Sequence, residues 1–192
     1  MSARRRELAR VVAVAGSAWP YGGEGEAAEA AGALAARLEK RGHEVELVLP
    51  DSAAVRRSEL ARGKARREPF QARFGELVVR GELWRTTGRD DQPIWVVAQE
   101  ELFGLRAADS TLGVLRSAFL SAAALAVARR GEHAADILHL HGVETALAAV
   151  LLSTTHAEVT ELARTRTVFT VHDPAELGLF ERKTLERMGL PA

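Results

Sequence analysis

Apolar and polar positions near the start of the chain follow a strand–helix–strand pattern. Residues 11–14 are an unbroken apolar run, which is typical of a strand buried on both faces. A glycine-rich loop follows over residues 16–25, and residues 27–38 then repeat their apolar positions every three or four residues, as an amphipathic helix does. Residues 45–49 form a second apolar run, which ends at Pro50. This βαβ unit predicts a parallel sheet with a right-handed crossover.

Strand-like and helical segments continue to alternate after this unit. Four apolar runs have the length or the alternation of strands: residues 76–84, 94–98, 136–140 and 167–171. Three segments with helical character lie among them: residues 112–130, 143–152 and 180–188. The first two strands are close enough in sequence to pair as a hairpin or at a sheet edge. The pattern predicts the α/β class, with a Rossmann-like, doubly wound, mostly parallel sheet and helices on both faces.

Three segments have a less distinct pattern. Residues 1–10 form a basic lead-in, which we expect to be solvated, ahead of a single domain over residues 11–192. Residues 51–73 are polar and strongly basic, which favours a solvated loop or an exposed helix; an anion-binding or partner-binding surface is the alternative. Residues 157–164 either continue the helix before them or replace it.

The charge balance and the absence of cysteine narrow the classes of function. The chain has 26 basic and 26 acidic residues, so no overall field favours nucleic acid or an anionic membrane as a partner. The absence of cysteine excludes disulfides, zinc–thiolate sites and a cysteine nucleophile. No apolar run approaches the roughly 20 residues of a membrane span, and the first run is too short for a signal sequence. We expect a cytoplasmic protein without a cofactor or a metal.

Three of the expected strands run into polar loops, at residues 17–25, 141–144 and 172–174. Ligands of open parallel sheets bind beyond the carboxyl ends of the strands. These loops should therefore gather on one rim, and this convergence makes the rim the candidate site. The candidate binding residues are Gly22, Gly23, Gly25, His141, Glu144, His172 and Asp173. No residue is assigned a catalytic role.

The glycines of the first loop have three interpretations. They would let the backbone approach a ligand closely, and they precede a helix N-terminus, where free N–H groups favour anions. A plain strand-to-helix turn is the alternative. The spacing Gly23-x-Gly25-x-x-Ala28, with Asp51 downstream, also matches the loose dinucleotide fingerprint. That fingerprint should follow its strand at once, whereas here about eight residues intervene.

Histidines cluster at the ends of two expected strands. His139 and His141 project to one side of a strand, and His172 ends a neighbouring one. Together with Glu144 or Asp173 they permit a metal site, but such residues at strand ends more often bond backbone groups or a substrate hydroxyl. A Ser–His–Asp triad is weaker still, because no serine lies on a G-x-S-x-G turn.

Seven short segments occur in a characteristic order. They are residues 41–50 (RGHEVELVLP), 101–103 (ELF), 118–121 (AFLS), 136–141 (DILHLH), 168–173 (VFTVHD), 178–180 (GLF) and 189–191 (GLP). In that order they resemble the N-terminal half of bacterial glycogen synthases and plant starch synthases. These are retaining glycosyltransferases of GT-B architecture that use ADP-glucose. The resemblance implies one Rossmann-like half of such an enzyme, with a sugar nucleotide or an α-glucan as the ligand of the rim.

The chain departs from the family's pattern at several positions. Pro20 stands where the family carries a lysine that grips the nucleotide sugar, although the acidic position after the third glycine is kept as Glu26. Glu144 stands where the family has the second histidine of its His-Asp-Trp-His motif. Leu112 and Gly113 correspond roughly to an Asp-Asn pair.

Length is the largest departure. In the family a second domain holds most of the nucleotide and supplies cations for the leaving diphosphate, and this chain ends before such a domain could begin. We therefore expect a glycogen synthase-like N-terminal glucosyltransferase domain that is inactive alone or depends on a partner. The face of the missing lobe would take a protein partner or a second copy. The alternatives are a non-catalytic interaction or scaffold protein that retains the fold, and a nucleotide-binding oxidoreductase-type domain that uses residues 23–28.

Overall fold

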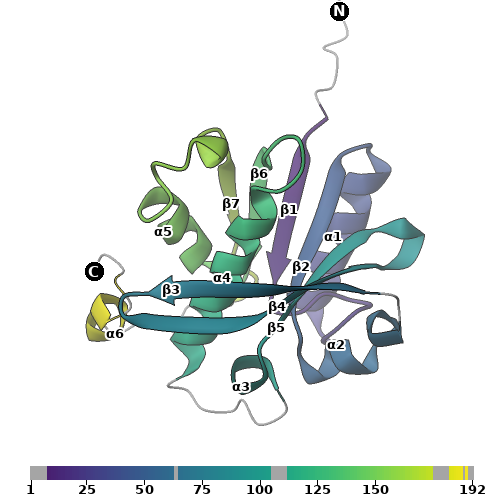
Figure 1. Ribbon diagram of the computed structural model, residues 1–192. Helices are drawn as coiled ribbons and strands as arrows, with labels where there is room; N and C mark the ends of the chain where they lie inside the picture. Colours follow the sequence, from purple (N-terminus) through teal and green to yellow (C-terminus); the bar gives the residue numbers. More distant parts are fainter. Residues whose placement is uncertain (1–7, 63–64, 105–111, 175–181, 188, 190–192) are drawn as a thin grey trace, which may run out of the picture.

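A computed structural model describes residues 8–62, 65–104, 112–174, 182–187 and 189, which form one sheet flanked by helices (Figure 1). The strands are β1 (Arg10–Ala15), β2 (Glu44–Pro50), β3 (Arg66–Phe74), β4 (Leu77–Thr87), β5 (Pro93–Ala98), β6 (Ile137–His141) and β7 (Arg166–Thr170). The helices are α1 (Glu26–Lys40), α2 (Ala53–Arg57), α3 (Glu100–Phe103), α4 (Gly113–Ala128), α5 (Leu147–Ser153) and α6 (Arg182–Arg187). Over these residues the strand order is β3-β4-β5-β2-β1-β6-β7.

Most neighbouring strands of this sheet are parallel. β5, β2, β1, β6 and β7 run in one direction. β4 pairs antiparallel with β5, and β3 pairs antiparallel with β4, so these two long strands form an edge hairpin. The predicted Rossmann-like, mostly parallel sheet is confirmed, and so is the pairing of the strands predicted over residues 76–84 and 94–98.

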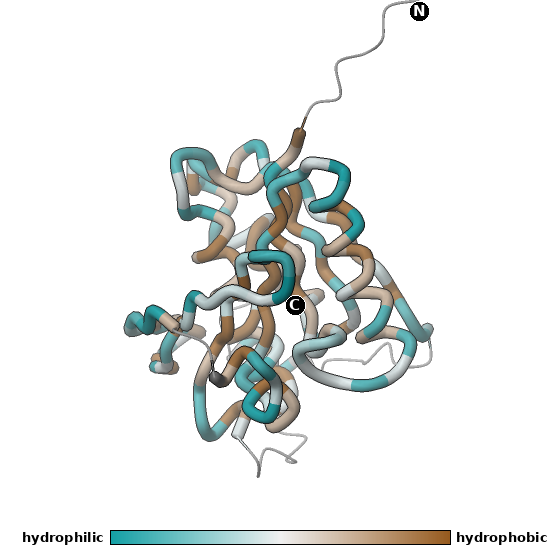
Figure 2. The backbone as a smooth tube through the Cα atoms, turned by 90° about the vertical axis from the view of Figure 1, so that its right-hand side faces the viewer, coloured by the Kyte–Doolittle hydropathy of each residue, from teal (hydrophilic) through white to brown (hydrophobic). Residues whose placement is uncertain are grey.

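Side chains of β1 alternate between two covered faces of the sheet. Val12 and Val14 belong to a core cluster with α4 and α5, whereas Ala13 and Ala15 belong to a cluster with Ala31 of α1. Figure 2 shows the apolar residues concentrated along the inner strands and the polar residues in the outer loops. Because both faces are covered, a central strand of this sheet reads as an unbroken apolar run.

Helix α4 is buried on two sides. It packs on the sheet, and the β3–β4 hairpin lies against its other side. The fully buried Phe119 ring lies 5.2 Å from the ring of Phe70 on β3, between ring centroids. A Cβ added at Gly81 of β4 would lie 3.0 Å from the Phe119 ring, so the glycine allows the hairpin to approach closely. Among the described helices, α4 included, none is long and apolar enough to cross a membrane.

The prediction of a loop or an exposed helix over residues 51–73 is wrong for residues 66–73. After α2 and a short 3₁₀ turn (Glu59–Arg62), the chain forms β3. Phe70, Ala72 and Phe74 are the more buried side chains of β3 and alternate with exposed ones. The strand lies at the sheet edge, where charged side chains face water. The many arginines of this segment therefore hide its two-residue period.

Two other predicted boundaries differ from the structure, and the bounds of the last helix lie partly outside the described residues. Residues 157–164 hold only a 3₁₀ turn (Thr160–Leu162), so no helix continues or replaces α5 there. Arg10 was predicted to belong to the solvated lead-in, but it is the first residue of β1 and its side chain is only 10% exposed. The last predicted helix is present as α6, while residues 180, 181 and 188 lie outside the described residues.

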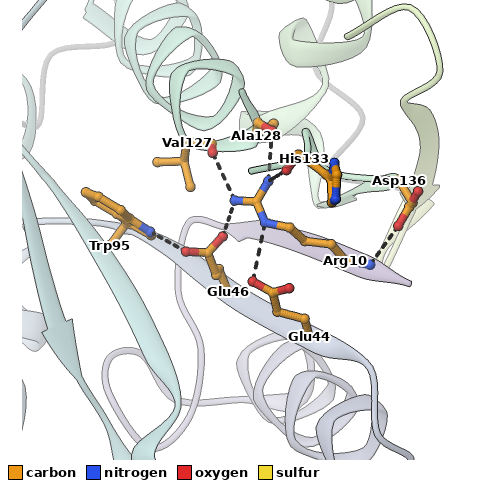
Figure 3. A network of polar contacts seen from close by, with 8 residues as sticks. All are labelled: Arg10, Glu44, Glu46, Trp95, Val127, Ala128, His133 and Asp136. Atoms are coloured by element: carbon orange, nitrogen blue, oxygen red, sulfur yellow. Dashed lines mark hydrogen bonds and ion pairs between the residues drawn. The ribbon is translucent and has the colours of Figure 1, made fainter. Parts of the chain in front are cut away.

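The Arg10 side chain joins several elements at the amino end of the sheet (Figure 3). Its guanidinium pairs with Glu46 of β2, and the two side chains are 10% and 7% exposed. The other carboxylate oxygen of Glu46 accepts a hydrogen bond from Nε1 of Trp95 on β5, at 3.0 Å. The guanidinium also donates to carbonyl oxygens at or just after the end of α4, those of Val127 (3.2 Å), Ala128 (3.0 Å) and His133 (3.2 Å). One buried ion pair therefore connects β1, β2, β5 and α4.

Replacing Glu46 should destabilise the fold far more than replacing its neighbour Glu44. Glu46→Ala leaves the buried Arg10 charge and the Trp95 indole without their acceptor, which should cost about 3–5 kcal/mol of unfolding free energy. Glu44 is 67% exposed and lies 3.6 Å from Arg10 Nε, so Glu44→Ala should cost at most about 1 kcal/mol. Urea denaturation of both variants measures the difference. Equal losses would contradict the role given to the buried pair.

Candidate functional site

The register of three parallel strands places their carboxyl ends side by side. Ala15 of β1 is the partner of His141 of β6, and His141 is the partner of Thr170 of β7. The loop after β6 is also tied to β7, because the Gly142 N–H donates to the Thr170 carbonyl at 3.0 Å. The three polar loops singled out in the sequence therefore begin next to one another.

These loops enclose a small pocket that contains four of the seven candidate residues. The pocket is lined by Ala15, Ser17, Ala27, His141, Gly142, Val143, Glu144, Val171, His172 and Asp173. His141, Glu144, His172 and Asp173 are therefore brought together as the sequence predicts. Ser17 and Ala27 were not among the candidates. Ser17 is the first polar residue after β1, and that position is the signal that would have found it.

Three stacked imidazoles form one wall of this region. The rings of His139 and His141 lie on the same side of β6 with centroids 4.2 Å apart, and His141 stacks on His172 at 5.4 Å. Nδ1 of His141 lies 3.1 Å from Nε2 of His172, so one of these nitrogens donates a hydrogen bond and the other accepts it. Nε2 of His139 lies 2.8 Å from the Thr170 hydroxyl oxygen. The β6–β7 pairing therefore fixes the orientation of all three rings.

Burial keeps the inner imidazoles uncharged. His141 is 3% exposed. The pKa of its imidazole is lowered to about 3, mainly by burial and then by the neighbouring charges of His139 and His172. Burial and the His172 charge also lower the pKa of His139. At neutral pH His141 and His139 therefore act as hydrogen-bonding groups for hydroxyls and carry no positive charge.

Two glycines make room for the carboxylate of Glu144 at the pocket. A Cβ at Gly16 would lie 2.4 Å from one carboxylate oxygen, and a Cβ at Gly142 would lie 2.6 Å from the other. Gly142 also has a φ of 77°, which favours glycine. The Glu144 backbone is held in place because the Ser117 hydroxyl donates to its carbonyl at 2.7 Å. Within the described residues Glu144 forms no ion pair, so its carboxylate is available to a ligand.

The three candidate glycines lie outside the pocket lining. Gly23 has a φ of 82° and packs against the pocket residue Ser17. A Cβ added at Gly23 would lie 2.4 Å from the Cβ of Ser17. Gly22 faces Val55 of α2 instead, and Gly25 is exposed at the start of α1 with nothing within 4 Å of an added Cβ. The sequence predicts that all three glycine backbones approach a ligand. Of the three, only Gly23 packs against a residue of this pocket.

The loop turns away from the pocket because it folds back on α1. A Cβ at Gly32 of α1 would lie 1.8 Å from the Trp19 carbonyl oxygen, so only glycine allows this close contact. Pro20, at the position where the resemblance places a lysine, lines a separate cavity with Trp19 and Tyr21. The hydroxyl of Tyr21 accepts a hydrogen bond from the Arg89 N–H at 2.8 Å and holds this arrangement.

Two of the alternative chemistries receive no geometric support. Within the described part of the chain, no group of three or more His, Asp or Glu side chains is arranged to hold a metal ion. Asp51, the acid of the loose dinucleotide fingerprint, is 2% exposed and paired with Arg56 at 2.8 Å, and it does not line the pocket.

Comparison with known proteins gives the family. The sequence profile of the starch synthase catalytic domain matches residues 10–192. The chain belongs to the starch synthase catalytic domain family. The resemblance drawn from the ordered segments is therefore confirmed.

Relatives within the starch synthase catalytic domain family are bacterial glycogen synthases. That of Geotalea daltonii is 30% identical over 187 residues, which cover 94% of the chain and 38% of the relative. Glycogen synthase 2 of Geobacter sulfurreducens is 32% identical over 189 residues, covering 95% and 39%. That of an Anaeromyxobacter species is 34% identical over 194 residues, covering 94% and 38%. The chain thus spans under two fifths of the length of these relatives.

A solved structure confirms the fold of this family member. The catalytic domain of starch synthase IV from Arabidopsis thaliana, bound to ADP and acarbose, superposes with a TM-score of 0.83 at 23% identity. The match covers 96% of this chain and 38% of that one. The predicted half of a GT-B fold is confirmed by this likeness.

Acid should destabilise the protein through His141. Because the folded pKa lies near 3 and an unfolded histidine titrates near 6.5, the unfolded state binds more protons below pH 6.5. Stability should therefore fall as the pH falls, by about 2 kcal/mol from this residue between pH 7 and pH 5. Urea midpoints at several pH values would show a shallower acid loss in His141→Asn.

His133→Asn is the control, because it removes an imidazole from an exposed position. An unchanged pH dependence in His141→Asn would show that His141 is protonated equally in both states, contrary to its buried position.

Proposed function

We propose that this chain is the acceptor-side part of a glycogen synthase-like glucosyltransferase and that its rim pocket binds a sugar nucleotide or an α-glucan. The family reaction is the transfer of glucose from ADP-glucose to an α-1,4-glucan. The observation that carries the proposal is the convergence of the uncharged His141 imidazole, the His172 imidazole and the Glu144 carboxylate in one pocket at the carboxyl edge of β1, β6 and β7. The proposal includes no cofactor, and a cytoplasmic location remains a prediction.

The chemistry of the pocket suits a sugar. The imidazoles of His141 and His172 can exchange hydrogen bonds with hydroxyl groups, and the Glu144 carboxylate can accept from one of them. Ala27, in the first turn of α1, also lines the pocket, and no side chain caps that helix N-terminus. Its free N–H groups would suit a phosphate oxygen of a sugar nucleotide.

The same pocket lacks what transfer requires. None of its described lining residues is a lysine or an arginine, whereas departure of a diphosphate is assisted by preorganised cations. We therefore propose ligand binding without turnover by this chain alone, with the cations supplied by a further lobe or by a partner chain.

A second candidate is an interaction protein that uses the β7 edge. Three large apolar side chains are exposed there: Val168 (43%), Phe169 (42%) and Val171 (40%). Exposed apolar side chains on an edge strand favour association with another chain. Light scattering would support this reading by detecting a dimer that Phe169→Lys abolishes, and a monomer that captures no partner would count against it.

Calorimetric titration tests the sugar proposal. The chain should release or absorb heat with ADP-glucose or with a maltooligosaccharide, and Glu144→Gln should weaken the affinity roughly ten-fold, as expected for one charge-assisted hydrogen bond. Glu158→Gln, at an exposed position outside the pocket, is the matched control and should bind as the unaltered chain does.

The absence of heat with either ligand at millimolar concentration would remove the sugar proposal. The oxidoreductase alternative has its own test, because it requires NAD to raise the melting temperature. No such rise is expected.

A further inference from the structure

A second cavity, of about 270 Å³, lies at the opposite end of the sheet from the rim pocket. It is lined in part by Arg10 and Glu44, the first residues of β1 and β2, whereas His141 is the last residue of β6. Four arginines and three glutamates contribute to its wall, together with Trp95. Its volume leaves room for several waters or for a small anion.

The glutamates of this cavity already have cationic partners. Glu44 and Glu46 pair with Arg10, and Glu68 pairs with Arg130. The other two arginines, Arg66 and Arg85, are exposed and have no carboxylate partner among the described residues. The lining as a whole therefore has a net charge of +1, and Arg66 and Arg85 are its two cations without a carboxylate partner among the described residues.

Arg66 and Arg85 lie directly opposite each other. They are register partners in the antiparallel β3–β4 pair, so their side chains leave the sheet on the same face. Like charges in this position destabilise a strand pair. An anion seated between the two guanidinium groups would turn this repulsion into attraction.

Trp95 and Arg130 complete the wall of the cavity. The guanidinium carbons of Arg85 and Arg130 lie 5.7 and 4.9 Å from the Trp95 ring centroid, so the indole orients both cations. Nε of Arg130 is buried and has no hydrogen-bond acceptor among the described residues. Planar guanidinium groups with spare donors match the oxygens of a phosphate group.

We propose that this cavity binds a phosphate dianion, either free phosphate or a phosphate monoester, through Arg66, Arg85 and Arg130. Arg66 and Arg85 offer two guanidinium groups without a carboxylate partner to the oxygens of a phosphate group, and a phosphate monoester is largely a dianion above its second pKa near 6. The site lies apart from the rim pocket, so the proposal does not depend on sugar binding. Occupancy would fasten the β3–β4 hairpin to the end of α4.

Denaturation at constant ionic strength and pH 7.5 tests this site. Inorganic phosphate and glycerol phosphate, each at millimolar concentration, should raise the urea midpoint above that measured in sodium chloride of equal ionic strength. Stabilisation by phosphate alone would indicate a site for the free anion, and stabilisation by both would indicate a site open to monoesters.

Matched variants connect the effect to the cavity. Arg66→Gln and Arg85→Gln should each weaken the phosphate affinity roughly ten-fold, and neither should lower the midpoint in the absence of phosphate, because each removes a repulsion. Arg73→Gln, at an exposed position on β3 outside the cavity, should respond to phosphate as the unaltered chain does. The proposal is overturned if neither phosphate stabilises the chain beyond sodium chloride. It is also overturned if Arg73→Gln loses as much phosphate affinity as Arg85→Gln.

Discussion

The parallel pairing of β1, β6 and β7 is the constraint on which the candidate site depends. In this register Ala15, His141 and Thr170 lie side by side, so the loops that follow must open onto the same rim. The pairing also stacks His141 on His172 and brings His139 to the Thr170 hydroxyl. At the other end of the same sheet, the Arg10–Glu46 pair fastens β1 to β2 and α4. The geometry of the rim is thus set by backbone hydrogen bonds and by a buried ion pair at the opposite end of the sheet.

The sequence predicts those parts of the fold and of the site whose signals are local. β1 and β2 are covered on both faces and read as apolar runs, whereas β3 is covered on one face and its Phe70–Phe74 alternation is hidden among arginines. His141, Glu144, His172 and Asp173 come together because they lie at or just after the carboxyl ends of β6 and β7. Gly22 and Gly25 lie outside the pocket because the loop direction depends on the contact of Trp19 with Gly32, which no local pattern records.

The two ends of the sheet differ in their chemistry. The carboxyl end offers imidazoles and the carboxylates of Glu144 and Asp173, which suit hydroxyl groups, while the amino end offers two arginines without a carboxylate partner, which suit a phosphate group. Membership of the starch synthase catalytic domain family agrees with the first arrangement. Pro20 and Glu144 mark two positions where this chain departs from the motifs that the resemblance implies, and only Glu144 lines the rim pocket. On the function proposed here, sugar binding is separable from transfer in this chain.

Amide chemical-shift mapping during a titration with a maltooligosaccharide tests the central claim most directly. If the three loops form one sugar-binding rim, the largest shifts should fall together on Ser17, Glu144, His172 and their neighbours. Saturable shifts centred instead on the cavity beside Trp19, or on the arginines at the amino end of the sheet, would contradict the account.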